Sequence, residues 1–516
     1  MKKIFAYAIA AIVAAATVSS CDLNLFPHGS LAYDEEGALF TNEKELGYFQ
    51  NGLYASFRSN FYGEYALTEE LMMDGFNATG DYGNNYGAIH RIDESFNPSD
   101  YNIRDFWAAR YSNIKDYNVF IKGVENLPAE YASLGKAAQL VKGEAYFFRA
   151  FAYLDLIRHF APEYNAATAK TDLGVPLVLV YDQTEKPSRA SVKAVYDQIK
   201  ADLDSAAFNL AAVPGKVASG SVTIDAVNAL YARYYLDVKQ YNKAYEKAVE
   251  VILSDAGYAL SSTLADFKKE YYNDNGKEAI MQLYASKTEN GSGTNNLFTF
   301  MANDSEHGDY FNSPYYIPSK KLLDLYDATD LRLQCWFTKG ANAFTGKTYP
   351  VKLVSEFYTK KFYIFTKYLG NPDLTSSNVL NGRQHVKPIL IGEMYLIAAE
   401  ACFRNNDVES ATEILRTLQS QRGAKPCTLA NEELLQNEWF KETVGEGLRL
   451  STIRRFGQGF NGRAGQTEAV AATVLMNGPD YETRAIAGTD YHLVWPIPSN
   501  EIQTNPNIAK EQNPGY

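Results

Sequence analysis

Two segments of this sequence concentrate the side chains that could bind a small molecule, because flat aromatic rings are mixed there with carboxylates and amides. The first segment contains Asp74, Phe76, Asn77, Asp81, Tyr82 and Tyr86. The second contains Asp309, Tyr310, Phe311, Tyr315 and Tyr316. Sugar rings present apolar C–H faces surrounded by hydroxyl groups, so aromatic platforms fit the faces while carboxylates and amides fit the hydroxyls. The clusters therefore favour carbohydrate binding.

The same aromatic residues could instead pin long loops onto the body of the protein. For any single residue that structural interpretation is the better one, and only the clusters as a whole favour binding. These loops contain few basic residues, which argues against a highly sulfated ligand, although His90 and Arg91 lie nearby and leave acidic sugars open.

Motifs for catalysis are scarce. The sequence contains neither the H-E-x-x-H pattern of metalloproteases nor the G-x-S-x-G nucleophile elbow, and no C-x-x-C pair among Cys335, Cys402 and Cys427. Residues 341–348 loosely match a phosphate loop, but Pro350 follows and no apolar helix begins there, so a polar surface hairpin is favoured. A catalytic pair of glycosidase carboxylates cannot be recognised from the number of Asp and Glu residues, because such a pair is defined by the distance between its two carboxyl groups. We expect no enzyme activity, no cofactor and no metal site.

The first twenty residues form a separate unit. Two lysines precede an apolar, alanine-rich stretch that is shorter than the roughly 20 residues needed to span a bilayer, which is typical of a signal peptide. Small residues then precede Cys21, as in a bacterial lipobox, although Ser20 is a looser match than Gly or Ala. We expect cleavage before Cys21 and its acylation with fatty acids such as palmitate, so that residues 21–516 hang on a lipid anchor. An ordinary signal peptide with an incidental cysteine is the alternative.

The composition of the 516-residue chain is that of a globular protein, with 46% hydrophobic and 21% charged residues. Its formal charge of −12 repels phosphate backbones, so no nucleic-acid partner is expected. After residue 20 no apolar run approaches the length of a transmembrane helix, so the lipid anchor would be the only contact with a membrane.

Helical periodicity defines the elements that must position the two segments. It predicts helices over 42–58, 106–124, 136–160, 191–207, 224–238, 241–253, 389–403, 408–421 and 432–456. Ser191 is a plausible N-cap. Residues 74–105 lack this periodicity and are expected to form a long loop, the first variable loop, while 270–385 is loop-rich and aromatic.

Small residues recur in two of the helix pairs. Ala232 and Ala244 are twelve residues apart, as are Ala399 and Ala411, and these are the small positions of a tetratricopeptide-like repeat. Small residues there let paired helices approach closely. Two ordinary helical hairpins are the alternative interpretation.

Several segments together resemble the SusD/RagB family of Bacteroidetes outer-membrane lipoproteins. They include Ser20–Pro27, Lys142–Tyr153, Gly174–Leu177, Ser191–Tyr196, Ile391–Ala401, Glu446–Arg449, Trp495–Pro498 and Gln512–Tyr516, in family order along the whole chain. Departures from the family pattern occur at Glu438-Trp439 and at Thr452–Arg455, both at positions expected to be structural.

The resemblance implies a mostly α fold, in which tetratricopeptide-like helical pairs form a scaffold with a loop-rich irregular remainder. Residues 21–516 would be a single SusD-like body, with an N-terminal part over 22–215 that carries the variable loop 74–105, and a C-terminal part over 216–516. The implied function is capture of oligosaccharide at the cell surface and delivery to a SusC-like, TonB-dependent outer-membrane barrel. Asp74 matches the acidic position before the family's variable loop.

Two other functions stay open at this stage. A RagB-like importer lid would carry peptide cargo, and would favour backbone-pairing groups and apolar pockets over flat platforms. A surface glycosidase would cleave the glycan instead of passing it on. The identity, linkage and length of a glycan are not defined by the sequence.

Overall fold

The computed structural model describes residues 38–62, 64–289, 298, 301–304, 309–375, 379–467, 470, 473–476 and 484–516. The expected signal peptide 1–20 and the acylated Cys21 lie outside these residues, so both stay predictions. The side chain of Asp309 also lies outside the description.

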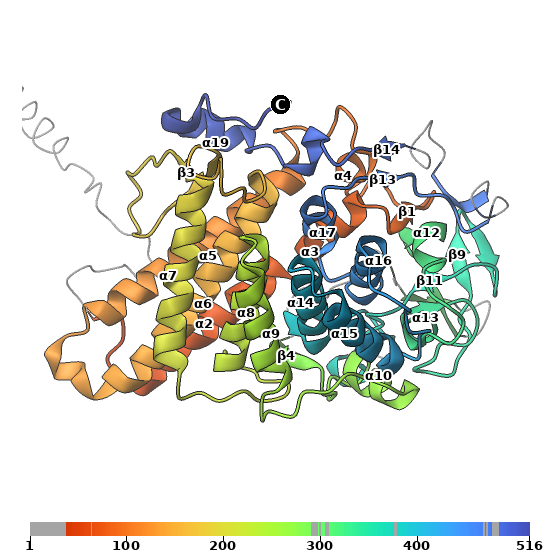
Figure 1. The fold of residues 1–516 in the computed structure, drawn as a ribbon, viewed down its shortest axis with the longest axis horizontal. Helices are drawn as coiled ribbons and strands as arrows, with labels where there is room; N and C mark the ends of the chain where they lie inside the picture. Colours follow the sequence, from red (N-terminus) through yellow and green to blue (C-terminus); the bar gives the residue numbers. More distant parts are fainter. Residues whose placement is uncertain are drawn as a thin grey trace, which may run out of the picture.

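Helices dominate the structure (Figure 1). Those of the first half are α2 (Glu43–Phe61), α3 (Glu64–Met72), α4 (Gly87–Arg91), α5 (Tyr101–Glu125), α6 (Gly135–Phe160), α7 (Val192–Leu210), α8 (Ile224–Asp237) and α9 (Tyr241–Ile252). Those of the second half are α10 (Leu264–Tyr271), α12 (Lys320–Leu323), α13 (Leu331–Trp336), α14 (Ile391–Arg404), α15 (Val408–Gln421), α16 (Glu432–Glu442), α17 (Arg449–Arg455) and α19 (Ser499–Thr504). Short 3₁₀ turns cover 129–134, 372–374, 491–493 and 506–508.

The strands are short and form small, mostly antiparallel sheets. The two-stranded pairs among the described residues are β1 (Phe76–Ala78) with β7 (Tyr316–Pro318), β2 (Leu173–Pro176) with β3 (Arg189–Ser191), β4 (Ala279–Met281) with β12 (Ile389–Leu390), β8 (Phe337–Thr338) with β11 (Ile364–Phe365), and β13 (Phe460–Asn461) with β14 (Ala485–Ile486). A larger sheet has the order β10-β9-β6-β5, formed by Glu356–Tyr358, Val351–Leu353, Asp309–Asn312 and Met301–Asp304. In this sheet β6 and β9 are parallel.

The helical scaffold has the expected paired packing. Helix α9 packs against both α8 and α14, and α14 packs against α15, which places the two helix pairs side by side (Figure 1). The alanines at the small positions, Ala232, Ala244, Ala399 and Ala411, are fully buried. A larger side chain at these positions would push the helices apart, because interiors are close-packed. The predicted fold class is confirmed.

Most helix boundaries agree with the periodicity, including the N-cap at Ser191, whose hydroxyl accepts a hydrogen bond from the amide of Ala194. The continuous helix predicted over 432–456 is wrong in its middle, because the chain breaks between α16 and α17. Gly445 and Gly447 have φ angles of +77° and +70° there, in the left-handed region that glycine adopts without strain.

The long loop predicted over 74–105 is also wrong in part. It contains strand β1 and helix α4, and α5 already begins at Tyr101. The hairpin interpretation of residues 341–348 is confirmed, since Ala341 and Thr348 form an antiparallel bridge.

Within the described ranges, no helix combines the length and apolar character needed to cross a membrane. Cys335, Cys402 and Cys427 all carry free thiols.

Candidate functional site

The structure brings the two aromatic and polar segments together, although they are far apart in the sequence. Strand β1 pairs with β7, so that Phe76 lies opposite Pro318 and Ala78 lies opposite Tyr316. The contact continues beyond the strands, where the amide of Thr79 donates to the carbonyl of Tyr315 at 2.9 Å. In Figure 1, β1 and α4 of the first segment lie among elements of the second half, next to β13, β14 and α12.

Asp74 anchors the first segment. Its carboxylate is fully buried, accepts two hydrogen bonds of 2.9 Å from the guanidinium of Arg449, and lies 2.7 Å from the ammonium of Lys321. Burial alone would raise the pKa of this carboxyl, but the two cations hold it well below its usual range. The oxygens of Asp74 are therefore occupied by protein partners, and this residue shapes the loop from inside.

Three other members of the predicted set are also enclosed. Phe76 and Tyr316 are fully buried, and the Phe76 ring packs against Phe298 with 4.4 Å between ring centroids. The amide of Asn77 is buried beside the carbonyl of Ala464 at 3.4 Å. These side chains hold the β1–β7 pair in place.

The loop after β1 reaches the surface. Tyr82 is 9% exposed, and its hydroxyl forms a polar cluster with Asn84 and Arg91. The Arg91 guanidinium donates to the Tyr82 hydroxyl at 3.0 Å and to the Asn84 side-chain oxygen at 2.8 Å. Asn84 is exposed and Asp81 is half-buried, so an amide and a carboxylate lie near the surface, and one oxygen of each accepts a hydrogen bond from the protein. That is the mixture of groups expected at a sugar site.

Tyr86 has a different position. It is 8% exposed and precedes α4 with a φ of +56°, so it turns the chain into the helix. This is an uncommon conformation for a bulky residue.

The second segment adds half-buried aromatic rings. Tyr310, Phe311 and Tyr315 are each partly accessible. Phe311 lies edge-on to Phe357 of β10, with 5.5 Å between centroids, and the ammonium of Lys352 lies within 6 Å of both rings. We call the surface formed by Asp81, Tyr82, Asn84, Tyr310, Phe311 and Tyr315 the loop face.

The β9–β10 hairpin closes one side of the loop face. The amide of Val354, at the hairpin tip, donates to the carboxylate of Asp81 at 2.7 Å. Sequence reasoning missed this hairpin and its residues Lys352 and Phe357. Only Val351-Lys352-Leu353 alternates between apolar and polar residues there, which is a weak strand signal.

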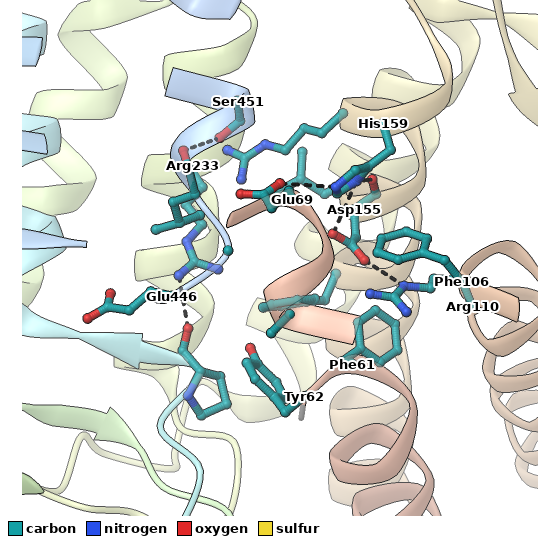
Figure 2. A pocket seen from close by; sticks show the side chains of 17 residues that line it. Phe61, Tyr62, Glu69, Phe106, Arg110, Asp155, His159, Arg233, Glu446 and Ser451 are labelled. Atoms are coloured by element: carbon teal, nitrogen blue, oxygen red, sulfur yellow. Dashed lines mark hydrogen bonds and ion pairs between the residues drawn. The ribbon is translucent and has the colours of Figure 1, made fainter. Parts of the chain in front are cut away.

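A cavity of about 50 Å³ lies apart from the loop face, between α3, α5, α6 and α17 (Figure 2). Within its lining, Glu69 lies 3.0 Å from His159, and Arg110 donates to Asp155 at 2.7 Å. The other charged residues of the lining, Arg158, Arg233 and Glu446, pair with residues outside it. The volume has room for a few water molecules. Because its charged side chains form ion pairs with protein partners and, among the buried polar atoms of its described lining, only Oε1 of Glu69 lacks a hydrogen bond, we regard this cavity as structural and the loop face as the better candidate.

Two family models match the chain. One, described as "Starch-binding associating with outer membrane", covers residues 34–236, and the other, described as the SusD family, covers residues 264–516. A curated relative, SusD-like protein P2 of Formosa agariphila, is 26% identical over 543 aligned positions that cover the whole of both chains.

Solved structures share the fold. A SusD superfamily protein of Bacteroides thetaiotaomicron is 25% identical with a TM-score of 0.71, and covers 91% of this chain and 99% of its own. A structure described as a putative sugar binding protein, from Bacteroides vulgatus, is 22% identical with a TM-score of 0.72, over 93% and 100% of the two chains. A laminarin-binding SusD-like protein is 20% identical with a TM-score of 0.68, over 92% and 100%.

Proposed function

The chain belongs to the SusD/RagB family, and on that basis we propose that it captures oligosaccharides at the cell surface and delivers them to a SusC-like, TonB-dependent barrel. As a member of this family it is a glycan-binding protein associated with the outer membrane, and it is not an enzyme. The surface glycosidase considered from the sequence is therefore set aside.

One observation supports the loop face as the binding surface. Two segments that separately have the composition of sugar sites are joined there, because β1 pairs with β7 and the Val354 amide links Asp81 to the β9–β10 hairpin. Rings and hydrogen-bonding groups in reach of one ligand are what a pyranose needs. The enclosed residues Asp74, Phe76, Asn77, Tyr82 and Tyr316 would support this surface from below, and Asp81, Asn84, Tyr310, Phe311 and Tyr315 would contact the glycan.

The test is a glycan array followed by affinity electrophoresis of the full-length protein in detergent. We compare wild type with a Tyr310→Ala, Tyr315→Ala double variant. The matched control is Tyr48→Ala, Tyr101→Ala, which removes two exposed tyrosines from α2 and α5. Loss of one stacking ring costs about 1 kcal/mol, so the double variant is expected to bind roughly tenfold or more weakly. Thermal melting checks that both variants fold.

Equal binding by the loop-face variant and the control would contradict the proposed surface. Binding to peptide mixtures and to no glycan would replace the glycan cargo by peptide, the alternative left open by the sequence. Co-purification of a TonB-dependent barrel with the tagged protein tests the delivery step. If no barrel co-purifies, the proposed delivery is contradicted and only the proposed capture of glycan stands.

The lipid anchor is tested separately. Replacement Cys21→Ser removes the thiol that acylation requires, so the protein is expected to move from the membrane fraction to the soluble fraction. An unchanged distribution would contradict anchoring through Cys21. Protease treatment of intact cells tests whether the anchored protein faces the outside.

A further inference from the structure

Residues 337–363 are strongly basic within an acidic protein. They contain five lysines, Lys339, Lys347, Lys352, Lys360 and Lys361, against a single carboxylate, Glu356. The chain as a whole has 49 basic and 61 acidic residues, so this segment departs from the rest in the sign of its charge. Such a reversal marks a surface that attracts anions.

Three of these lysines converge on one concave surface. It is lined by Lys339, Lys360 and Lys361 together with Tyr349 and Tyr358, and Val351, Phe362 and Ile364 contribute its apolar part. The pairing of the strands explains the convergence: β9 pairs with β10 and β8 pairs with β11, so the residues that follow β8 and β10 meet. We call this surface the lysine pocket.

The lysine pocket has no internal counter-charge. No aspartate or glutamate lines it, and none of Lys339, Lys360 and Lys361 forms an ion pair within the described residues. All three lysines are exposed. The ammonium of Lys339 lies 5.5 Å from the centroid of the Tyr363 ring, and lysines that line one concavity without a carboxylate give it a positive potential that favours a bound anion.

From this geometry we propose that the lysine pocket binds an anionic substituent of the glycan, a sulfate ester or a carboxylate. The proposal rests on the glycan-binding function above and assigns its substrate class. Lysine donates to an oxyanion as a point charge, without the planar fork with which arginine binds a carboxylate, and the segment 337–363 contains no arginine. The half-buried rings of Tyr349 and Tyr358 offer apolar surface and hydroxyl groups to the sugar that carries the anion.

The pocket lies close enough to the loop face for one glycan chain to reach both. The β9–β10 hairpin contacts the loop face at its tip, through Val354 and Asp81, and contributes Val351 and Tyr358 to the pocket at its base. Three strand residues separate tip and base, which corresponds to roughly 10 Å. The two aromatic loops contain few basic residues, which argued against a sulfated ligand. The structure adds Lys339, Lys360 and Lys361 from a third segment.

The test uses affinity electrophoresis of the full-length protein in gels that contain dextran, carboxymethyl dextran or dextran sulfate. The variant is Lys360→Gln, Lys361→Gln. The control is Lys136→Gln, Lys170→Gln, which removes the same charge from exposed positions at the start of α6 and in the 161–172 connector. A net negative protein is repelled by a polyanion, so retention has to come from a local basic surface.

Wild type and control are expected to be retained by dextran sulfate, carboxymethyl dextran or both, and the lysine variant to bind about tenfold more weakly. The polymer that retains the protein identifies the substituent: dextran sulfate indicates a sulfate ester, and carboxymethyl dextran indicates a carboxylate. Raising the salt concentration is expected to weaken wild-type binding more steeply than binding by the variant.

Equal retention of the lysine variant and the control would overturn the proposal. The proposal would also be overturned if wild type bound the charged dextrans no better than dextran, although it bound neutral glycans on the array. In both cases the glycan-binding function still stands. Failure to bind any polysaccharide, charged or neutral, would overturn the proposed function and this inference together.

Discussion

The helical scaffold and the strand-rich segment 337–363 place their positive charges in opposite settings. In the scaffold, Arg149 lies 2.6 Å from Asp202 and Arg233 lies 2.6 Å from Glu393, with both partners of each pair buried. In the strand-rich segment, lysines such as Lys360 and Lys361 are exposed and face no carboxylate in the pocket that they line.

The cost of burial explains the difference. A buried ion loses its hydration, and only a well-placed partner of opposite charge compensates for that loss. An exposed lysine keeps its hydration and needs no partner. Buried arginines such as Arg149 therefore stabilise the fold through ion pairs, whereas exposed lysines such as Lys360 can bind a ligand.

The largest test of this contrast is the replacement Arg422→Met. The buried guanidinium of Arg422 donates to Glu278 at 2.7 Å and also pairs with Glu442, so its removal leaves two buried carboxylates short of a counter-charge. We expect a loss of about 3–5 kcal/mol in the free energy of unfolding, measured by urea denaturation. A loss below about 1 kcal/mol would contradict the proposed difference between buried arginines that stabilise the fold and exposed lysines that do not.

The second test concerns the buried charge beneath the loop face. Replacement Asp74→Asn removes the negative charge that holds Arg449 and Lys321, and should cost about 2–3 kcal/mol of unfolding free energy. It should also weaken glycan binding, because the loop after β1 loses its anchor. Unchanged stability with weakened binding would instead indicate that Asp74 contacts the ligand directly.

The third test uses a buried carboxyl that lacks a cationic partner of its own. Burial and then the charge of Glu69 raise the pKa of Glu70 to about 8. The folded protein keeps this carboxyl protonated while the unfolded chain ionises above its ordinary pKa of about 4.5, so the group's contribution to stability is lost as pH rises from 4.5 to 8. Glu70→Gln copies the protonated form. It should be nearly neutral at pH 4.5 and stabilise the protein by about 4 kcal/mol at pH 8, because each pH unit between the two pKa values contributes about 1.4 kcal/mol.

Thermal melts of wild type and variant across that pH range supply the measurement. Taking the difference between the two removes the contribution of other titrating groups. A difference that does not change with pH would contradict the assignment of the raised pKa to Glu70.

The smallest expected effect is on the exposed lysines themselves. Lys360→Gln, Lys361→Gln should change the free energy of unfolding by less than about 0.5 kcal/mol, because surface substitutions away from special features rarely do more. Urea denaturation of this variant and of Arg422→Met under the same conditions compares the two losses of unfolding free energy directly. A large loss of stability would show that these lysines serve the fold.

Local sequence patterns defined the helical scaffold well and the loop face poorly. Helix α6 begins within one residue of its predicted start and ends at Phe160 as predicted, because its periodicity and length are strong local signals. The pairing of Phe76 with Pro318 leaves no such signal, since it joins segments that are far apart in the chain.

The burial of the candidate-site residues could not be predicted from the sequence. The sequence identified both aromatic segments, but could not separate Asp74 and Phe76, which are enclosed, from Asp81 and Tyr315, which reach the surface. Burial depends on the tertiary partners of each residue. Those partners, such as Arg449 and Phe298, come from distant parts of the chain.

The β1–β7 pair also has a consequence for how the protein folds. Phe76 leaves the ribosome about 240 residues before Pro318, which corresponds to roughly 10–50 seconds of synthesis. During that time β1 has an unpaired edge, and closing so long a loop carries an entropic cost that local helix formation does not. The helical pairs can therefore form early, and the loop face is completed late, so mutations within it should alter the rate of unfolding more than the rate of folding.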